Sequence, residues 1–158
     1  GIGYDIHKID TTSKNGLKLC GIKINHSKLI GHSDADVGIH AIIDALLGSS
    51  ALGDIGKYFP DTKKKYKGIS SLKLLKKIKN ILTDLKIEIN HLDCTLVAEK
   101  PKISKYTRKM CSIISKTLEI EIDKVSIKGT TTEGLGFSGR KEGISCYCVA
   151  TVKQYREA

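Results

Sequence analysis

Three groups of polar residues stand out because their types and spacing could support chemistry. The first is Asp5-Ile6-His7, a carboxylate and an imidazole one residue apart in a segment that alternates as a strand does. Residues i and i+2 of a strand point to the same face, so both side chains can reach one ion. Chance pairs of this kind are common, and the motif therefore needs a partner from elsewhere in the chain.

The second group is a polar stripe in an otherwise apolar segment, where Asp36, His40 and Asp44 recur every four residues. Residues at this spacing share one face of a helix. Ser33 and Asp36 also fit a capping box, which explains Asp36 as part of a helix N-terminus. His40 needs another explanation, because carboxylates at i−4 and i+4 can orient an imidazole and raise its basicity, as a metal-bound histidine requires.

These two groups together predict a metal site. Asp5, His7 and His40 form a ligand set of one carboxylate and two imidazoles. Three protein ligands leave the fourth position of tetrahedral zinc open, which is typical of a catalytic site. The alternative is that His40 is a buried histidine with ordinary hydrogen-bond partners. The residues alone leave both interpretations open. If zinc binds here, Asp44 would accept the free ring N–H of a zinc-bound histidine.

The third group is the run Thr130-Thr131-Thr132-Glu133. Hydroxyls and backbone amides in a turn suit phosphate oxygens, and a carboxylate beside them suits a hard cation such as Mg²⁺ or Mn²⁺. The alternative is a strand end with β-branched residues. The sequence thus favours a phosphate and cation segment without requiring it.

Strands and helices must bring these groups together. Alternation predicts strands at 2–9, 87–99, 124–129 and 144–155, and Asn15-Gly16 predicts a hairpin turn with 17–24 as its second arm. Apolar periodicity predicts helices at 34–48, 70–86 and 104–120. We predict an α/β fold of the α+β type, with helices covering one face of a mixed sheet. The bare face of that sheet would need a partner.

Composition limits the classes of function. The chain has 158 residues, 40% of them hydrophobic, and fits a single domain spanning 1–158. Its net charge of +10 is almost all lysine, since Arg108, Arg140 and Arg156 are the only arginines. Surfaces that bind nucleic acid favour arginine and aromatic residues, so no nucleic-acid partner is expected. No apolar run reaches the roughly 18–20 residues of a membrane span, so no membrane partner is expected either.

The cysteines and the first residue carry two smaller expectations. The five cysteines are an odd number without a C-x-x-C pair, which predicts packing rather than disulfides or a zinc knuckle. The chain starts at Gly1 rather than Met, so we expect a missing native N-terminus and any targeting peptide lost with it.

Three stretches resemble one enzyme family. GYDIH, HSDADVGIHAIIDALLGSSALGDIGKYFPDT and TTTEGLGFSGRKEGI are similar to the 2-C-methyl-D-erythritol 2,4-cyclodiphosphate synthases of the non-mevalonate isoprenoid pathway. The resemblance covers essentially the whole chain in the right order. It implies that 4-diphosphocytidyl-2-C-methyl-D-erythritol 2-phosphate is cyclised to 2-C-methyl-D-erythritol 2,4-cyclodiphosphate and that CMP is released. Phosphoryl transfer of this kind asks mainly for alignment and charge stabilisation.

The resemblance also implies residue roles. Asp5, His7 and His40 match the zinc ligands, and Glu133 matches the ligand of a second divalent metal, Mg²⁺ or Mn²⁺. His32 and Thr131 match the transition-state stabilisers, and so are the implied catalytic residues. The implied substrate-binding residues are Asp5, His7, His32, Ser33, Asp54, Ile55, Gly56, Phe59, Pro60, Asp61, Thr62, Lys63, Ala98, Glu99, Lys100, Pro101, Lys102, Ile103, Ser104, Thr130, Thr131, Thr132, Glu133, Phe137 and Arg140.

Within that set the resemblance assigns segments to parts of the substrate. Residues 54–56 match the segment that receives the methylerythritol hydroxyls, 59–63 a mobile loop near it, and 98–104 a backbone-rich cytidine pocket. The family is a homotrimer with active sites between neighbouring subunits. Its axial cavity can take an isoprenoid diphosphate, with an arginine matching Arg140 at the mouth. The family's pathway implies a plastid-type organelle for a eukaryotic source and the cytoplasm for a bacterial one.

Two departures from the family pattern carry expectations. Ala35 stands where the family usually has Gly, and because Ala suits the first turn of a helix we expect no loss of activity. Tyr147 stands where some members place a Glu facing the arginine, so we expect Arg140 to be less neutralised.

Three rival functions remain open at the level of sequence. A zinc hydrolase would use the open metal position to activate water and would not bind CMP. A basic nucleic-acid-binding module would show a steep salt dependence. A carrier of isoprenoid diphosphates would use a trimer cavity without turnover.

Overall fold

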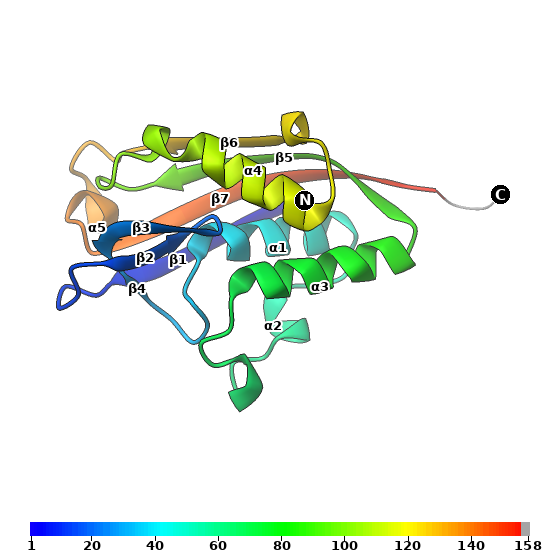
Figure 1. Ribbon diagram of the computed structural model, residues 1–158, viewed down its shortest axis with the longest axis horizontal. Coiled ribbons are helices and arrows are strands. Elements are labelled where there is room, and N and C mark those ends of the chain that lie inside the picture. The colour runs from blue at the N-terminus through cyan, green and yellow to red at the C-terminus, as the bar shows by residue number, and fades with distance from the viewer. Residues whose placement is uncertain (156–158) are drawn as a thin grey trace.

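The computed structural model describes residues 1–155, and its centre is a five-stranded sheet in the order β4-β1-β7-β5-β6 (Figure 1). The strands are β1 (Ile2–Ile9), β2 (Gly16–Leu19), β3 (Ile22–Ser27), β4 (Leu29–Ile30), β5 (Ile87–Val97), β6 (Val125–Thr130) and β7 (Gly143–Gln154). The β5–β6 pair is parallel, and the other pairs of this sheet are antiparallel. The mixed sheet predicted from the sequence is therefore confirmed.

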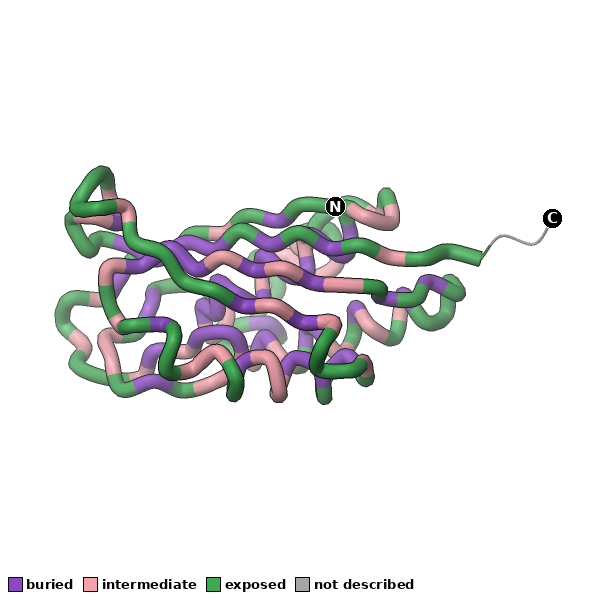
Figure 2. Tube along the Cα trace, turned by 90° about the horizontal axis from the view of Figure 1, so that it is seen from above, coloured by how far each residue is buried: buried purple, intermediate pink, exposed green. Residues whose placement is uncertain are grey.

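Helices lie on one face of this sheet, as predicted (Figures 1 and 2). The three long ones are α1 (Val37–Ser49), α3 (Ser71–Asp84) and α4 (Thr107–Leu118), and two single turns are α2 (Ile55–Tyr58) and α5 (Gly136–Gly139). Helix α1 packs on β1 and β7 and is in turn covered by α3 and α2. This double cover explains why α1 is apolar on nearly every side, because a helix enclosed by other elements buries its whole circumference.

The close approach of α1 to β1 depends on a glycine. A Cβ atom on Gly3 would lie 1.9 Å from the carbonyl oxygen of Ala41 and 2.7 Å from the backbone nitrogen of Ala45. Gly3 shares its face of β1 with Asp5 and His7, since alternate residues of a strand point the same way. The missing side chain therefore lets the helix that carries His40 rest directly on the strand that carries its partners.

The predicted hairpin at Asn15-Gly16 is wrong. Strands β2 and β3 form the hairpin, and its turn is Cys20-Gly21, with φ of 48° and 82°. Positive φ at both central positions matches the right-handed twist of two-residue hairpins. A distant carboxylate supports this turn: Cys20 N and Gly21 N donate to the two oxygens of Asp36, at 2.8 and 2.7 Å. Asp36 lies outside the hairpin segment, so the local sequence did not indicate that it supports the turn.

The other face of the sheet is exposed and partly apolar, which agrees with the expectation of a bare face. Five large apolar side chains of β1 and β7 point outward there, and we call them the open face: Ile2, Tyr4, Ile6, Tyr147 and Val149. Ile2 is 69% exposed, and Tyr4 stacks against Tyr147 with ring centroids 4.7 Å apart. Figure 2 shows exposed and buried positions alternating along these strands.

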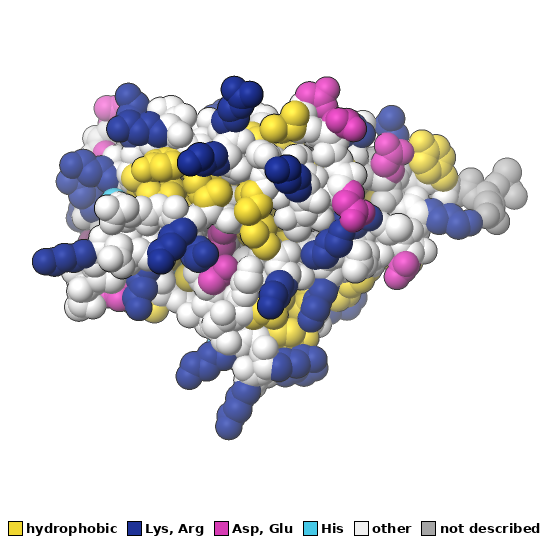
Figure 3. All heavy atoms as spheres, viewed as in Figure 1, with side chains coloured by type: hydrophobic (Ala, Val, Ile, Leu, Met, Phe, Trp, Pro, Cys, Tyr) yellow, Lys and Arg dark blue, Asp and Glu magenta, His cyan; other side chains and the backbone are white. Residues whose placement is uncertain are grey.

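Three further predictions concern cysteines, lysines and membrane spans. All five cysteines are free, and Cys20, Cys94, Cys146 and Cys148 belong to the buried core, as expected for packing residues. Figure 3 shows lysine and arginine side chains scattered singly over the face it presents, without a continuous stripe. None of the helices within residues 1–155 is long and apolar enough to cross a membrane.

Candidate metal centre and substrate cavities

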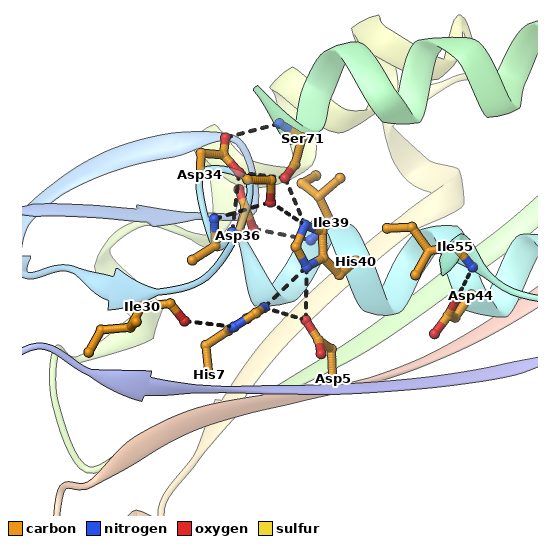
Figure 4. A network of polar contacts seen from close by, with 12 residues as sticks. Asp5, His7, Ile30, Asp34, Asp36, Ile39, His40, Asp44, Ile55 and Ser71 are labelled. Carbon is orange, nitrogen blue, oxygen red and sulfur yellow. Dashed lines mark hydrogen bonds and ion pairs between the residues drawn. The ribbon is translucent and has the colours of Figure 1, made fainter. Parts of the chain in front are cut away.

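Strand β1 and helix α1 bring the three predicted metal ligands together (Figure 4). Asp5 Oδ2 lies 2.9 Å from His7 Nε2 and 3.0 Å from His40 Nδ1, and the two ring nitrogens are 3.2 Å apart. Asp5 and His7 point to one face of β1, as their spacing predicted. One carboxylate oxygen and two imidazole nitrogens thus converge on a single point and form a candidate site for a divalent metal.

The backbone fixes the orientation of the His7 ring. Its Nδ1 atom lies 3.0 Å from the carbonyl oxygen of Ile30 on the neighbouring strand β4. A carbonyl only accepts hydrogen bonds, so Nδ1 carries the proton and donates. The Nε2 atom is then left with a free lone pair that faces Asp5 and His40, which is the tautomer a metal ligand needs.

Asp5 and His7 stabilise each other's charged forms in the absence of a metal. Burial of Asp5 favours its neutral form, but hydrogen bonds from His40 and His7 outweigh this effect and lower its pKa to about 2. Burial likewise opposes the charged form of His7, but the hydrogen bond and the charge of Asp5 raise the pKa of His7. The metal-free site is therefore a coupled carboxylate–imidazole pair.

Asp36 is the N-cap of α1 rather than the third residue of a capping box that starts at Ser33. Its Oδ1 atom accepts from Ile39 N at 3.1 Å, while its two oxygens also hold the Cys20-Gly21 turn. Asp36 is 1% exposed, and burial raises its pKa although three backbone N–H groups favour the carboxylate. The general prediction that Asp36 caps the helix is confirmed, but the capping box is wrong.

The prediction for Asp44 is wrong. Its Oδ1 atom accepts from the backbone nitrogen of Ile55 at 2.8 Å, at the start of α2. Both ring nitrogens of His40 have other partners, as Figure 4 shows. Asp44 thus ties α2 to α1, and the direction of its carboxylate follows from where the 51–55 segment returns to the helix.

The expectation for Ala35 rested on a wrong position. Ala35 is not in the first turn of the helix but precedes the N-cap, in the left-handed region with φ of 57°, and it is buried. Glycine adopts this conformation at the lowest cost, which gives a physical reason for the glycine usual in the resembling family. The methyl group here is accommodated at the expense of backbone strain.

A cavity of about 390 Å³ opens beside the candidate metal centre. Its lining includes His7, His40, His32 and Ser33, so two residues of the implied substrate-binding set, His32 and Ser33, lie next to the metal ligands. The predicted methylerythritol and loop segments contribute Ile55, Gly56, Phe59, Pro60 and Asp61. Asp54 does not line this cavity but caps α2 by accepting from Lys57 N, and Thr62 and Lys63 also lie outside its lining.

A second cavity, of about 810 Å³, contains the other predicted segments. Its lining consists of His26, Ala98, Glu99, Lys100, Pro101, Lys102, Ile103, Ser104, Gly129, Thr130, Thr131 and Glu133. The whole predicted cytidine segment therefore lies against the predicted phosphate and second-metal segment. The two cavities share no lining residue.

Glu99 joins the two segments of the second cavity. Its Oε1 atom accepts from Thr132 N at 3.0 Å, from Thr132 Oγ1 at 3.3 Å and from Gly134 N at 3.4 Å. These contacts flank Glu133, whose backbone is left-handed with φ of 53°. Glu99 therefore fixes the loop that carries Glu133, a role that position alone did not reveal.

Phe137 and Arg140 have different surroundings. Phe137 lines a cavity with His7 and Glu142, whereas Arg140 makes an exposed ion pair with Glu142, with Nε 2.9 Å from Oε1. The expectation that Arg140 is poorly neutralised because of Tyr147 is wrong, since the carboxylate partner comes two residues after the arginine. Tyr147 instead belongs to the open face.

Sequence reasoning missed two residues behind His40, of which Ser71 contacts the ring and Asp34 contacts Ser71. Ser71 and Asp34 form a hydrogen-bonded chain behind its ring (Figure 4). Asp34 lies inside the HSDAD stretch already quoted, and Ser71 is at the predicted start of a helix. No spacing in the sequence links the two residues, and only the fold places them side by side.

A one-sided mixed sheet and a candidate metal centre of one carboxylate and two histidines place this chain among α/β proteins with a candidate site for a divalent metal. Comparison with known proteins narrows this class. The YgbB family model matches residues 1–153. The chain therefore belongs to the YgbB family.

Relatives over nearly the full length carry one name. The 2-C-methyl-D-erythritol 2,4-cyclodiphosphate synthase of Desulforamulus reducens is 51% identical over 155 residues, which is 98% of each protein. That of Clostridium acetobutylicum is 53% identical, covering 92% of this chain and 93% of the relative. The chain is accordingly a lyase-type enzyme of non-mevalonate isoprenoid biosynthesis.

Solved structures agree with this assignment. The Plasmodium falciparum IspF in complex with CDP has a TM-score of 0.86 and 34% identity, with 99% of this chain and 96% of that one covered. The bifunctional IspDF of Campylobacter jejuni has a TM-score of 0.92 and 36% identity. The match covers 98% of this chain and 42% of the bifunctional protein.

Proposed function

We propose that this chain cyclises 4-diphosphocytidyl-2-C-methyl-D-erythritol 2-phosphate to 2-C-methyl-D-erythritol 2,4-cyclodiphosphate and releases CMP. An oxygen of the 2-phosphate attacks the β-phosphorus, the bond from that phosphorus to the bridging oxygen breaks, and CMP leaves with the bridging oxygen. The convergence of Asp5, His7 and His40 beside a cavity lined by His32 and Ser33 is the observation that carries this proposal.

The ligand atoms fit zinc. Two atoms that are each about 2.0–2.1 Å from a tetrahedral zinc ion lie about 3.3 Å apart, and the three ligand atoms here are 2.9–3.2 Å apart. Zinc held by Asp5, His7 and His40 would supply a Lewis acid that polarises a phosphoryl oxygen. Because the Nδ1–H of His7 donates to Ile30 O, the Nε2 atom of His7 is free to bind the zinc ion.

The chain's own residues supply orientation and charge stabilisation. His32 and Ser33 lie beside the metal ligands, where a phosphate would be within reach of their side chains. Ile55 and Gly56 line the same cavity, at the place proposed for the methylerythritol hydroxyls. A flexible linear substrate that must close into a ring gains most from enforced orientation.

The second cavity is proposed to hold the cytidine diphosphate end. Residues 98–104 would surround the cytosine and ribose, and Thr130, Thr131 and Glu133 would face the phosphates, with Mg²⁺ or Mn²⁺ at Glu133. The CDP complex of the Plasmodium falciparum relative supports a site for a cytidine nucleotide in this fold. Thr131 is proposed to stabilise the transition state from this side.

We propose a homotrimer in which neighbouring copies complete the active site. The metal half of the proposed site is the cavity beside Asp5, His7 and His40, and the cytidine half is the cavity lined by residues 98–104. These two cavities have no lining residue in common. The open face is an apolar surface suited to surround a common axis. An isoprenoid diphosphate is proposed to enter the axial cavity of this trimer. Arg140, the residue proposed for the mouth of that cavity, is paired with Glu142.

Product analysis on the cytidylated substrate tests the reaction. Phosphorus NMR should show CMP and the cyclic diphosphate appearing in equal amounts when zinc and Mg²⁺ are present. His40→Ala should lose zinc and activity together. Glu133→Gln should keep its zinc, lose turnover and recover part of it at raised Mg²⁺ or Mn²⁺. Linear hydrolysis products would favour a zinc hydrolase, and full zinc occupancy in His40→Ala would refute the ligand assignment.

A further inference from the structure

The side of the His40 ring that faces away from Asp5 contacts two serine hydroxyls. His40 Nε2 lies 2.9 Å from Ser71 Oγ and 3.0 Å from Ser33 Oγ. Ser71 Oγ also hydrogen-bonds to Asp34 Oδ1. A chain of hydrogen bonds therefore runs from the carboxylate of Asp34 through the hydroxyl of Ser71 to the metal-binding ring of His40 (Figure 4).

Donor and acceptor rules fix the direction of the hydrogen bonds in this chain. A carboxylate can only accept, so the single hydroxyl proton of Ser71 goes to Asp34. The hydroxyl oxygen of Ser71 then has only lone pairs to offer His40, and Nε2 must donate to it. When a metal replaces the proton on Nδ1, the proton that the ring keeps is thus on Nε2, and Nδ1 presents its lone pair to the point shared with Asp5 and His7. Ser33 does not fix the tautomer, because its hydroxyl proton has no such acceptor and it can donate or accept.

Asp34 is itself held in place. Its Oδ2 atom accepts from the backbone nitrogen of Ser71 at 3.0 Å, and its Oδ1 atom accepts from Asp36 N at 3.2 Å. Its own backbone nitrogen donates to Ile69 O at 3.1 Å. Ser71 is 0% exposed, so water does not compete for its hydroxyl. A fixed carboxylate and a dry hydroxyl give the imidazole one orientation and one tautomer.

We infer that Asp34 and Ser71 are positioning residues that set His40 as an Nδ1 metal ligand by holding its proton on Nε2. Outer partners of metal-bound histidines orient the ring and typically change metal affinity or activity by about 10- to 100-fold. Asp34 acts through Ser71 in this arrangement. The inference rests on the zinc site of the proposed function but not on the reaction, because zinc release can be measured without substrate.

A double-mutant cycle on zinc release to a chromogenic chelator tests the inference. Ser71→Ala removes the acceptor but keeps the backbone nitrogen that Asp34 caps, and zinc release should become about 10-fold faster or more. Asp34→Ala frees the Ser71 hydroxyl to donate and should accelerate release similarly. The double variant should release zinc no faster than Ser71→Ala alone, because coupled residues are non-additive.

Controls separate positioning from support of α3. Ser70→Ala changes the neighbouring serine, which makes no side-chain capping bond, and Asp44→Asn changes a carboxylate that contacts Ile55 instead of His40. Both should release zinc at the wild-type rate. If Asp34 only caps α3, then Asp34→Ala will lower thermal stability, and its effect on zinc will persist undiminished in the Ser71→Ala background.

A spectroscopic readout tests the tautomer directly. Two-bond proton–nitrogen NMR spectra of the zinc complex should show the remaining His40 ring proton on Nε2 and zinc bonded through Nδ1. A ring proton on Nδ1 with zinc bonded through Nε2 in the wild-type zinc complex, or additive zinc effects, would overturn the inference. An inactive protein with the expected zinc kinetics would instead count against the proposed reaction alone.

Discussion

His7 holds its proton more tightly than a free imidazole because Asp5 Oδ2 lies 2.9 Å from its Nε2 atom. Burial works in the opposite direction, but the hydrogen bond and charge of Asp5 prevail and the pKa of His7 is raised. A divalent metal must take the place of that proton, since metal-bound histidine is neutral. Asp5, with a pKa of about 2, is already ionised at any pH where the protein would work.

Metal binding should therefore be linked to protons through His7. Between the ordinary imidazole pKa of about 6.5 and the raised pKa, the metal-free site carries a proton that is absent from the metal complex. Zinc affinity should fall about tenfold per pH unit below the raised pKa. Calorimetry in buffers of different ionisation enthalpy should detect the released proton. A zinc affinity that stays flat from pH 8 to pH 6 would contradict this linkage.

At the scale of elements, the site depends on how closely α1 rests on β1. The contact is backbone to backbone at Gly3, so the distance between Asp5 and His40 is set by the packing of a helix on a strand. Interiors are close-packed, and an inserted methyl group must displace its neighbours.

Gly3→Ala should therefore damage both stability and metal binding. Its Cβ atom would overlap the carbonyl oxygen of Ala41, next to His40, and the helix must move away. Overpacking of this kind costs about 1–3 kcal/mol, and we expect a value near the upper end in chemical denaturation. Zinc release should also accelerate. Gly48→Ala is the matched control: a Cβ atom there would lie 3.9 Å from the carbonyl oxygen of Ile2, and alanine should be neutral or stabilising.

The sequence predicted elements well where a local pattern decides them. The alternation of β1, the apolar periodicity of α3 and the spacing of Asp5, His7 and His40 all reflect geometry within one element. The predicted hairpin failed because a carboxylate at Asp36, in a different element, supports the turn at Cys20-Gly21. The residues around the turn do not indicate such a partner.

The failures within the site have the same origin. Asp44 lies on the face of α1 that the four-residue spacing predicted, yet its carboxylate contacts Ile55, because the chain returns there after the helix. Ser71 becomes a partner of His40 because the start of α3 packs against the 32–34 segment, where Gly68 N donates to His32 O. Spacing places a residue on a face, and tertiary packing selects what that residue contacts.

At the scale of the whole molecule, charge and apolar surface are arranged differently. The lysines are scattered over the face that Figure 3 presents, as expected for a general positive field rather than a binding stripe. The apolar residues of the open face are instead gathered on β1 and β7. This contrast favours association with copies of the same chain, as in the proposed trimer, over association with a nucleic acid.

The separation of the two cavities has a genetic consequence. If each active site takes its metal half from one copy and its cytidine half from the next, two inactive variants can complement each other. His40→Ala damages the first half, and Glu133→Gln damages the second. In any trimer that contains both variants, about one junction in three joins two intact halves. Co-expressed variants, purified through two different tags so that only mixed trimers remain, should therefore regain about a third of wild-type turnover, whereas separately assembled variants mixed without subunit exchange should stay inactive. Mixed trimers without turnover would show that one copy supplies both halves.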